Sequence, residues 1–134
     1  MTDVGEVIDE AVRALATRIA HDMIPLKGWD VNLMQVTPNA GHGGSRLGQK
    51  SNTTIAVENE GILNLLLQFF EQEDFQEQAI EALSQLQDAL VESELQPWPM
   101  CLRHEHVMVP TGIGEELYWV CPDDDEIRVR VGNL

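Results

Sequence analysis

A pattern of potential metal ligands near the end of this 134-residue chain limits the folds open to it more than any other feature. Cys101-x2-His104-x-His106 is followed by Cys121-x2-Asp124. Zinc takes sulfur, nitrogen and carboxylate ligands in tetrahedral geometry, and it gathers them within roughly 2.0 to 2.3 Å of one point. Two short loops carrying these residue types therefore predict a structural Zn²⁺ site.

The segments between the two loops are predicted to bring them together. Residues 106–110 (HVMVP) are expected to be extended, residues 111–116 (TGIGEE) supply glycines for a reversal, and residues 117–121 (LYWVC) form a second strand. In such an antiparallel pair the end of the second strand lies beside the start of the first. Residues 127–131 (IRVRV) then run back as a third strand.

Three ligands follow from this arrangement, namely Cys101, His104 and Cys121. The fourth stays open between Asp124, whose C-x2-D spacing mirrors the first loop, and His106, which is the better zinc ligand by chemistry. A disulfide between the two cysteines, or two reduced buried thiols, is the alternative. The first residues lack the basic and apolar regions of a secretory signal, so we expect a reducing, cytoplasmic setting, which counts against the disulfide.

The last 37 or so residues, Trp98 to Leu134, also carry a resemblance. The runs WPMCLRHEHVMVP and YWVCPDDDEIRVRVGNL resemble the Cys/His carboxy-terminal segments of uncharacterised small proteins from actinobacteria and their phages, which in turn resemble zinc ribbons. In that pattern proline usually follows the first cysteine, whereas this chain has Leu102. The resemblance implies a metal-stapled module in a cytoplasmic or viral setting, and no activity.

Charge is distributed very unevenly along the chain. The formal net charge is -15, with 23 acidic and 8 basic residues, and residues 51–102 contain no Lys, Arg or His. Proteins that bind DNA or RNA use Lys and Arg to neutralise phosphates, so direct nucleic-acid binding is not expected. The acidic segment is either a solvated surface or a face that imitates nucleic acid towards a basic partner. No apolar run is long enough for a membrane span.

The first half of the chain predicts a helix and a β hairpin. Apolar residues recur at three- and four-residue steps from Val4 to Ile24, which is typical of an amphipathic helix. The patterns of Trp29–Val36 and Thr53–Glu58 predict two strands that pair. Between them, residues 38–52 form a long glycine-rich loop, which is either a disordered insertion or an arm that orders on a partner.

Residues 59–92 predict an acidic helical hairpin. Residues 62–70 are apolar on nearly every side of a helix, which is typical of a buried helix or of one that meets another subunit. Asp74 is placed to cap a second helix that runs to about Glu92.

Together these features predict an α+β protein with a helical body and glycine-rich arm in residues 1–96 and a three-stranded zinc-ribbon-like module in residues 97–134. Catalysis is not expected, because Glu105, between the two histidines, has only a superficial likeness to the H-x-E of zinc deaminases and the matching P-C-x-x-C is missing. We therefore expect a non-catalytic interaction or assembly protein, an adaptor or small structural component of a homo-oligomer or of a larger complex such as a phage virion. An acidic inhibitor that imitates nucleic acid is the alternative.

Overall fold

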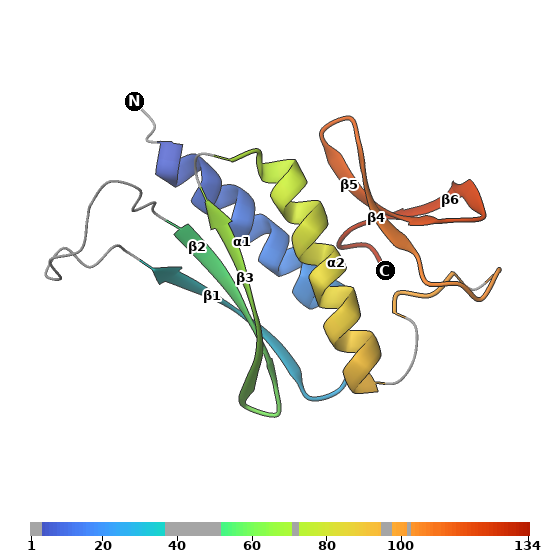
Figure 1. Ribbon diagram of the computed structural model, residues 1–134, viewed down its shortest axis with the longest axis horizontal. Helices are drawn as coiled ribbons and strands as arrows, with labels where there is room; N and C mark the ends of the chain where they lie inside the picture. Colours follow the sequence, from blue (N-terminus) through green and yellow to red (C-terminus); the bar gives the residue numbers. More distant parts are fainter. Residues whose placement is uncertain (1–3, 37–51, 71–72, 95–97, 102) are drawn as a thin grey trace, which may run out of the picture.

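The chain folds into three layers, with two helices between two antiparallel sheets (Figure 1). A computed structural model describes residues 4–36, 52–70, 73–94, 98–101 and 103–134. The predicted glycine-rich arm, residues 38–52, lies outside these ranges except for its last residue. The elements are α1 (Val4–Asp22), β1 (Trp29–Val36), β2 (Asn52–Asn59), β3 (Ile62–Phe70), α2 (Phe75–Glu94), β4 (Val109–Ile113), β5 (Glu116–Cys121) and β6 (Asp124–Arg130).

The predicted first helix and the predicted pairing of the two strands after it are confirmed. Helix α1 buries its apolar stripe, which includes Val12, Leu15 and Ile19, against β1 and β2. Strand β1 pairs antiparallel with β2, so that Val31 lies opposite Val57 and Leu33 opposite Ile55. The sheet buries one face against both helices, which is the expected arrangement for an antiparallel sheet with helices on one side.

The prediction of a helix over residues 59–70, and hence of a helical hairpin, is wrong. Residues 62–70 instead form β3, which pairs antiparallel with β2 in the order β1-β2-β3. Glu60 and Gly61 both have positive φ, 53° and 80°, and connect Asn59 to its partner Ile62 in a two-residue turn. Positive φ at both central residues is what the tight hairpin turn of a twisted sheet requires.

The physical reason for this error lies in the composition of β3. Its side chains alternate, with Leu67 and Phe69 buried and Leu66 and Gln68 exposed, but leucine occupies both faces. An apolar run of this kind has no visible period of two, and periodicity alone does not separate a strand from a buried helix. The nine-residue length and the preceding glycine were the signals that favoured a strand.

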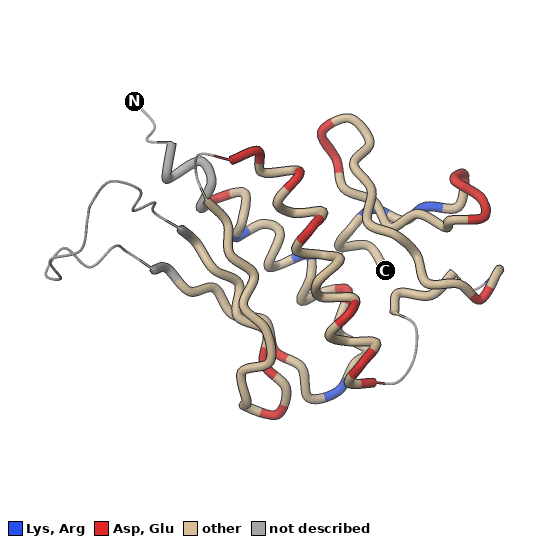
Figure 2. The backbone as a smooth tube through the Cα atoms, in the orientation of Figure 1, with Lys and Arg blue, Asp and Glu red and all other residues tan. Residues whose placement is uncertain are grey.

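Helix α2 confirms the second predicted helix and its cap. The Asp74 carboxylate accepts a hydrogen bond from the Glu77 amide at 3.0 Å, which satisfies one of the free N–H groups of the first turn. Leu83, Leu86 and Leu90 are fully buried along one side. The opposite side is exposed and acidic, as Figure 2 shows along the length of the helix.

Uncharged amides attach α2 to both sheets. The Gln78 amide bonds to the backbone of Phe70 in β3, and the Gln76 amide donates to the carbonyls of Gly114 and Glu116 in the β4–β5 hairpin. Further along the helix, the amide of Gln87 donates to the carbonyls of Trp98 and Met108. Three glutamines of one helix thus hold the two sheets on either side of it.

The predicted three-stranded module after residue 97 is present as the second sheet, in the order β4-β5-β6. Leu117, Trp119 and Cys121 are buried, and Trp98 stacks edge-on against Trp119 with ring centroids 5.4 Å apart. The observed fold is therefore mixed α and β, with two helices and two three-stranded sheets among the described residues. Buried residues of both predicted parts belong to one hydrophobic cluster, and the predicted boundary at residues 96–97 lies outside the described ranges.

Candidate metal centre

The first loop has the backbone of a tight knuckle. Cys101 donates its amide hydrogen to the carbonyl of His106, and the Glu105 amide donates to the carbonyl of Cys101, both at 2.8 Å. These bonds bring Glu105 and His106 back beside Cys101. Glu105 adopts a φ of 55°, the left-handed region that non-glycine residues rarely enter. The Cys101 and His104 side chains are held on the same loop as a result.

The second loop is the turn between β5 and β6. Cys121 ends β5 and lies opposite Asp124, the first residue of β6, across the turn residues Pro122 and Asp123. A register shift between Val120 and Cys121 marks a local irregularity in the ladder, and such bulges re-aim side chains. The hairpin therefore delivers the Cys121 thiol to the first loop, as the sequence predicted.

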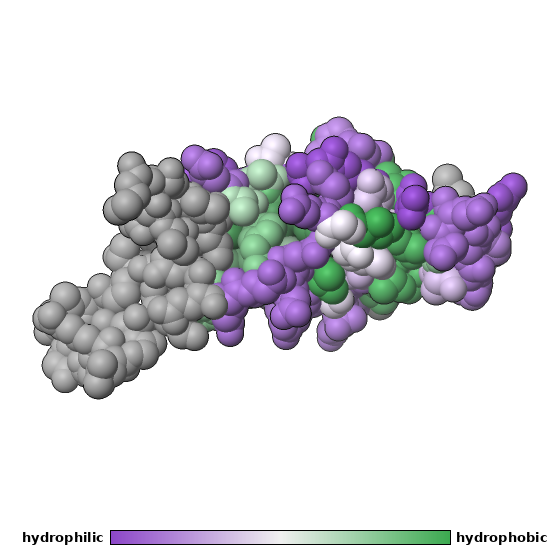
Figure 3. All heavy atoms as spheres, turned by 90° about the horizontal axis from the view of Figure 1, so that it is seen from above, coloured by the Kyte–Doolittle hydropathy of each residue, from purple (hydrophilic) through white to green (hydrophobic). Residues whose placement is uncertain are grey.

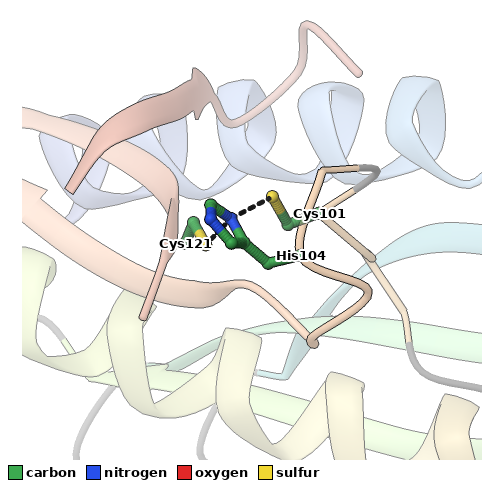
Figure 4. Close-up of side chains that lie close together, drawn as sticks. All are labelled: Cys101, His104 and Cys121. Carbon is green, nitrogen blue, oxygen red and sulfur yellow. Dashed lines mark hydrogen bonds between the residues drawn. The ribbon is translucent and has the colours of Figure 1, made fainter. Parts of the chain in front are cut away.

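The side chains of Cys101, His104 and Cys121 lie close together (Figure 4). The Cys101 sulfur lies 3.7 Å and the Cys121 sulfur 3.4 Å from Nδ1 of His104, and the three ligand atoms lie within 4.8 Å of one another. Zinc–sulfur and zinc–nitrogen bonds of about 2.3 and 2.0 Å at a tetrahedral angle separate the two ligand atoms by about 3.5 Å. The three side chains are close enough to bind a metal ion.

Burial and hydrogen bonding make the two thiols chemically distinct from surface cysteines. Both cysteines are free, and Cys101 and Cys121 are only 2% and 1% exposed. The hydrogen bond with His104 is the main cause that lowers the pKa of Cys101 from 9.0 to about 7, although burial acts in the opposite direction. A thiol with this pKa supplies thiolate, the form that binds metals, near neutral pH.

The two candidates for a fourth ligand lie outside this group of three. Nε2 of His106 pairs with the Asp123 carboxylate at 2.9 Å, and both side chains are about half exposed. The Asp124 carboxylate accepts a hydrogen bond from the Glu126 amide at 3.0 Å through Oδ1. His106 therefore joins the first loop to the second through Asp123, a contact that the sequence analysis missed.

The candidate site is interpreted from its own geometry, because no related protein is found. No family model, curated protein or solved structure matches the chain. The resemblance to zinc-ribbon tails accordingly stays a prediction. Within the described residues, neither α1 nor α2 combines the length and the apolar character that crossing a bilayer requires.

The predicted acidic surface is concentrated on α2. Glu77, Glu81, Asp88 and Glu92 are exposed, and their spacing of four, seven and four residues keeps them on one side of the helix (Figure 2). All four side chains are exposed, so this stripe faces solvent.

Proposed function

We propose that this protein is a non-catalytic interaction or assembly component whose second sheet is held in place by a structural Zn²⁺ ion bound to Cys101, His104 and Cys121. The observation that carries the zinc proposal is the pair of sulfur-to-Nδ1 distances, 3.7 and 3.4 Å, which match the edges of a zinc tetrahedron. Such an ion would join the loop before β4 to the end of β5 and give a small zinc-ribbon-like module a fixed shape.

A structural role fits this site better than a catalytic one. A catalytic zinc ion keeps one coordination position for water or substrate, and a general base lies close to that position. Here both thiols are buried, and Glu105, the carboxylate nearest in sequence to the histidines, is exposed and held by a left-handed backbone.

For the fourth ligand we favour Asp124 over His106. Residues directly opposite each other on antiparallel strands point to the same face, with Cβ atoms about 4.5 to 5.5 Å apart. Asp124 is the cross-strand partner of Cys121, so its side chain extends from the same face of the hairpin as the Cys121 thiol. His106 is already paired with Asp123. Donation of a carboxylate oxygen would complete a ligand set of two thiolates, one imidazole and one carboxylate.

The interaction role is supported by the surface of the first sheet. Exposed hydrophobic side chains are concentrated at the start and middle of β3, where Ile62, Leu63 and Leu66 are 72%, 52% and 41% exposed. Figure 3 shows another face of the molecule, seen from above, where hydrophobic side chains also lie between hydrophilic ones. Exposed apolar surface with a polar surround is typical of sites where proteins meet.

Metal content and mass measured on one purified sample test this proposal. We expect about one zinc per chain under reducing conditions, lost in Cys101→Ser and in Cys121→Ser. His21→Gln, which changes a histidine at the end of α1 outside the group of three ligands, is the matched control and should keep its zinc. A wild-type protein that purifies without a transition metal and does not take up added zinc would overturn the structural-zinc proposal.

The acidic stripe of α2 favours one second candidate, an inhibitor that occupies the nucleic-acid-binding surface of a basic enzyme. Its exposed carboxylates carry charge without intervening cations, because residues 51–102 contain no Lys, Arg or His. Binding by charge is screened by salt. Partner capture that survives high salt supports the assembly role, whereas capture of a nucleic-acid enzyme that disappears with salt supports the inhibitor.

A further inference from the structure

We infer that the outer edge of β3 is a docking site for an extended, basic segment of a partner protein, which adds to the first sheet as a fourth strand. The inference rests on the proposed interaction role and names the surface and the kind of partner. Within the described part of the chain, β3 ends the sheet order β1-β2-β3. An exposed edge offers a row of backbone donors and acceptors to a further strand.

The contact between Gln78 and Phe70 shows which backbone groups face outward. The Gln78 amide accepts a hydrogen bond from the Phe70 N–H at 2.7 Å and donates to the Phe70 carbonyl at 2.9 Å. One side-chain amide thereby makes both bonds that a neighbouring strand would make. Because backbone groups alternate along a strand and the register is regular from Leu65 to Phe70, Gln68 and Leu66 also direct their N–H and C=O groups outward.

A groove with a volume of about 240 Å³ runs along this edge between β3 and α2. Leu66, Leu67 and Gln68 line its strand side, while Glu81, Ala82 and Gln85 line its helix side. The small side chain of Ala82 leaves room beside the strand, and the Glu81 side chain is exposed. The groove therefore combines a carboxylate with a strand edge on which the backbone groups of Leu66 and Gln68 face away from β2.

The two sides of the groove define the chemistry of the added strand. Successive side chains of a strand point to opposite faces of the sheet. Residues of the partner that point towards α2 would meet the carboxylates of Glu73 and Glu81, which favours Lys or Arg. Residues that point to the open face would lie beside Leu66, which is 41% exposed, and this favours apolar side chains. The matching partner is an extended segment with alternating basic and apolar residues.

Charge also argues against a second copy of this chain as the occupant. Pairing β3 with β3 of another copy would bring two acidic helices together, since Glu73 and Glu81 lie beside the edge in each. Like charges at close range are unfavourable for association. A basic partner avoids this repulsion and gains attraction instead.

A synthetic peptide of alternating Lys and Val, roughly eight residues long to match a strand, tests the inference on the zinc-loaded protein. Amide hydrogen exchange is read residue by residue by NMR. We expect exchange at Leu66 and Gln68 to slow by at least about tenfold when the peptide is bound. Exchange at Leu67 and Phe69, whose amides face β2, should stay slow with and without peptide. No protection at Leu66 and Gln68 at millimolar peptide would overturn the inference.

Matched variants separate strand addition from simple charge attraction. Glu81→Gln should weaken binding about fivefold, whereas Glu92→Gln, on the same helix but outside the groove, should change it much less. The same peptide with every backbone nitrogen methylated, so that both of its edges lose their donors, should not bind. Equal weakening by Glu81→Gln and Glu92→Gln, or binding by the methylated peptide, would refute an edge-strand site.

Two further readouts keep this result separate from the zinc proposal and from self-association. Gln68→Pro removes the outward N–H, which edge strands tolerate, and it should abolish peptide binding. If the protein instead forms dimers that Gln68→Pro dissociates, the edge belongs to a second copy and the inference fails. Zinc content is measured on the same samples, so that a wild-type protein that holds zinc but does not bind the peptide counts against the docking site alone.

Discussion

The buried carboxylate of Asp22 accepts a hydrogen bond from the indole nitrogen of Trp119, 97 residues further along the chain, at 3.0 Å. The same carboxylate accepts backbone N–H groups from Gly132 at 2.7 Å and Leu134 at 3.0 Å. Asp22 ends α1 and is only 1% exposed. A single side chain thus ties the first helix to the second sheet and to the segment that follows it.

Removal of this carboxylate is expected to be strongly destabilising. Asp22→Ala would leave three N–H donors without their acceptor, and each such loss costs about 1 kcal/mol or more, so we expect the free energy of unfolding to fall by roughly 3 kcal/mol. Urea unfolding measures the loss. Asp30→Ala, which removes an exposed carboxylate, is the control and should change stability by less than about 0.5 kcal/mol. Equal effects of the two variants would contradict the anchoring role.

The fourth zinc ligand is decided by comparing two conservative variants. Asp124→Asn should lower zinc affinity by at least about tenfold, because it replaces a charged ligand by a neutral amide. His106→Gln should leave affinity nearly unchanged and reduce stability by less than about 1 kcal/mol, since its pair with Asp123 is half exposed. Competition with a chromophoric chelator measures both affinities. A larger loss of zinc affinity in His106→Gln than in Asp124→Asn would instead identify His106 as the fourth ligand.

The metal-free fold is expected to gain stability as pH rises. The folded-state pKa of Cys101, about 7, lies below its ordinary value of 9.0, mainly because of the hydrogen bond with His104. Ionisation of this thiol therefore stabilises the fold fully above about pH 9, and the contribution is lost as pH falls through about 7. Thermal unfolding of the chelated, reduced protein between about pH 6 and pH 9 measures this dependence.

The control for this pH dependence is Cys101→Ser, which has no thiol to ionise. Its midpoint temperature should rise less between the same two pH values. A second check is the thiolate absorbance of Cys121→Ser, in which Cys101 is the remaining cysteine; adding His104→Ala should move its titration upward. Unchanged titration in that double variant would contradict the role of His104.

Because the backbone of Glu105 is left-handed, we expect a glycine at this position to stabilise the fold. Glu105→Gly removes the strain of a non-glycine residue at φ 55°, which is about 1 kcal/mol, and the exposed side chain loses no packing. Glycine also raises the entropy of the unfolded chain, so the net change should be between zero and about 1 kcal/mol of stabilisation. Glu92→Gly in α2 should instead cost about 1 kcal/mol. A similar loss of stability in Glu105→Gly and Glu92→Gly would show that the backbone of Glu105 is not strained.

The contact between α2 and the β4–β5 hairpin is tested at Gly112. A Cβ at this position would lie 2.7 Å from Nε2 of Gln76, so Gly112→Ala must displace that amide from the carbonyls of Gly114 and Glu116. We expect a loss of about 1 kcal/mol. Gln76→Ala should cost a similar amount, and the double variant should cost less than the sum. Additive losses would show that the two residues act independently.

Much of the fold was predictable from local pattern. The apolar stripe of α1, the alternation in β1 and the capping residue Asp74 each act within a few residues, and each prediction was confirmed. Strand β3 was mistaken for a helix because its apolar side chains occupy both faces, and only pairing with β2 decides its conformation.

The metal centre was predictable to the extent that hairpin geometry determines it. Antiparallel pairing brings Cys121 back to Cys101 and His104, and the structure places these three side chains together. The partnership of His106 with Asp123 depends on side-chain reach between two loops, which spacing does not encode. Asp22 was missed for a related reason, since its three partners lie 97 to 112 residues away.

The three glutamines that attach α2 to the two sheets have a consequence for behaviour across solution conditions. An amide neither titrates nor carries a net charge, so acid and ionic strength act on these attachments far less than on the carboxylates around them. The attachment of α2 to the two sheets should therefore persist in acid and in concentrated salt, while the negative charge of the surrounding carboxylates is neutralised or screened.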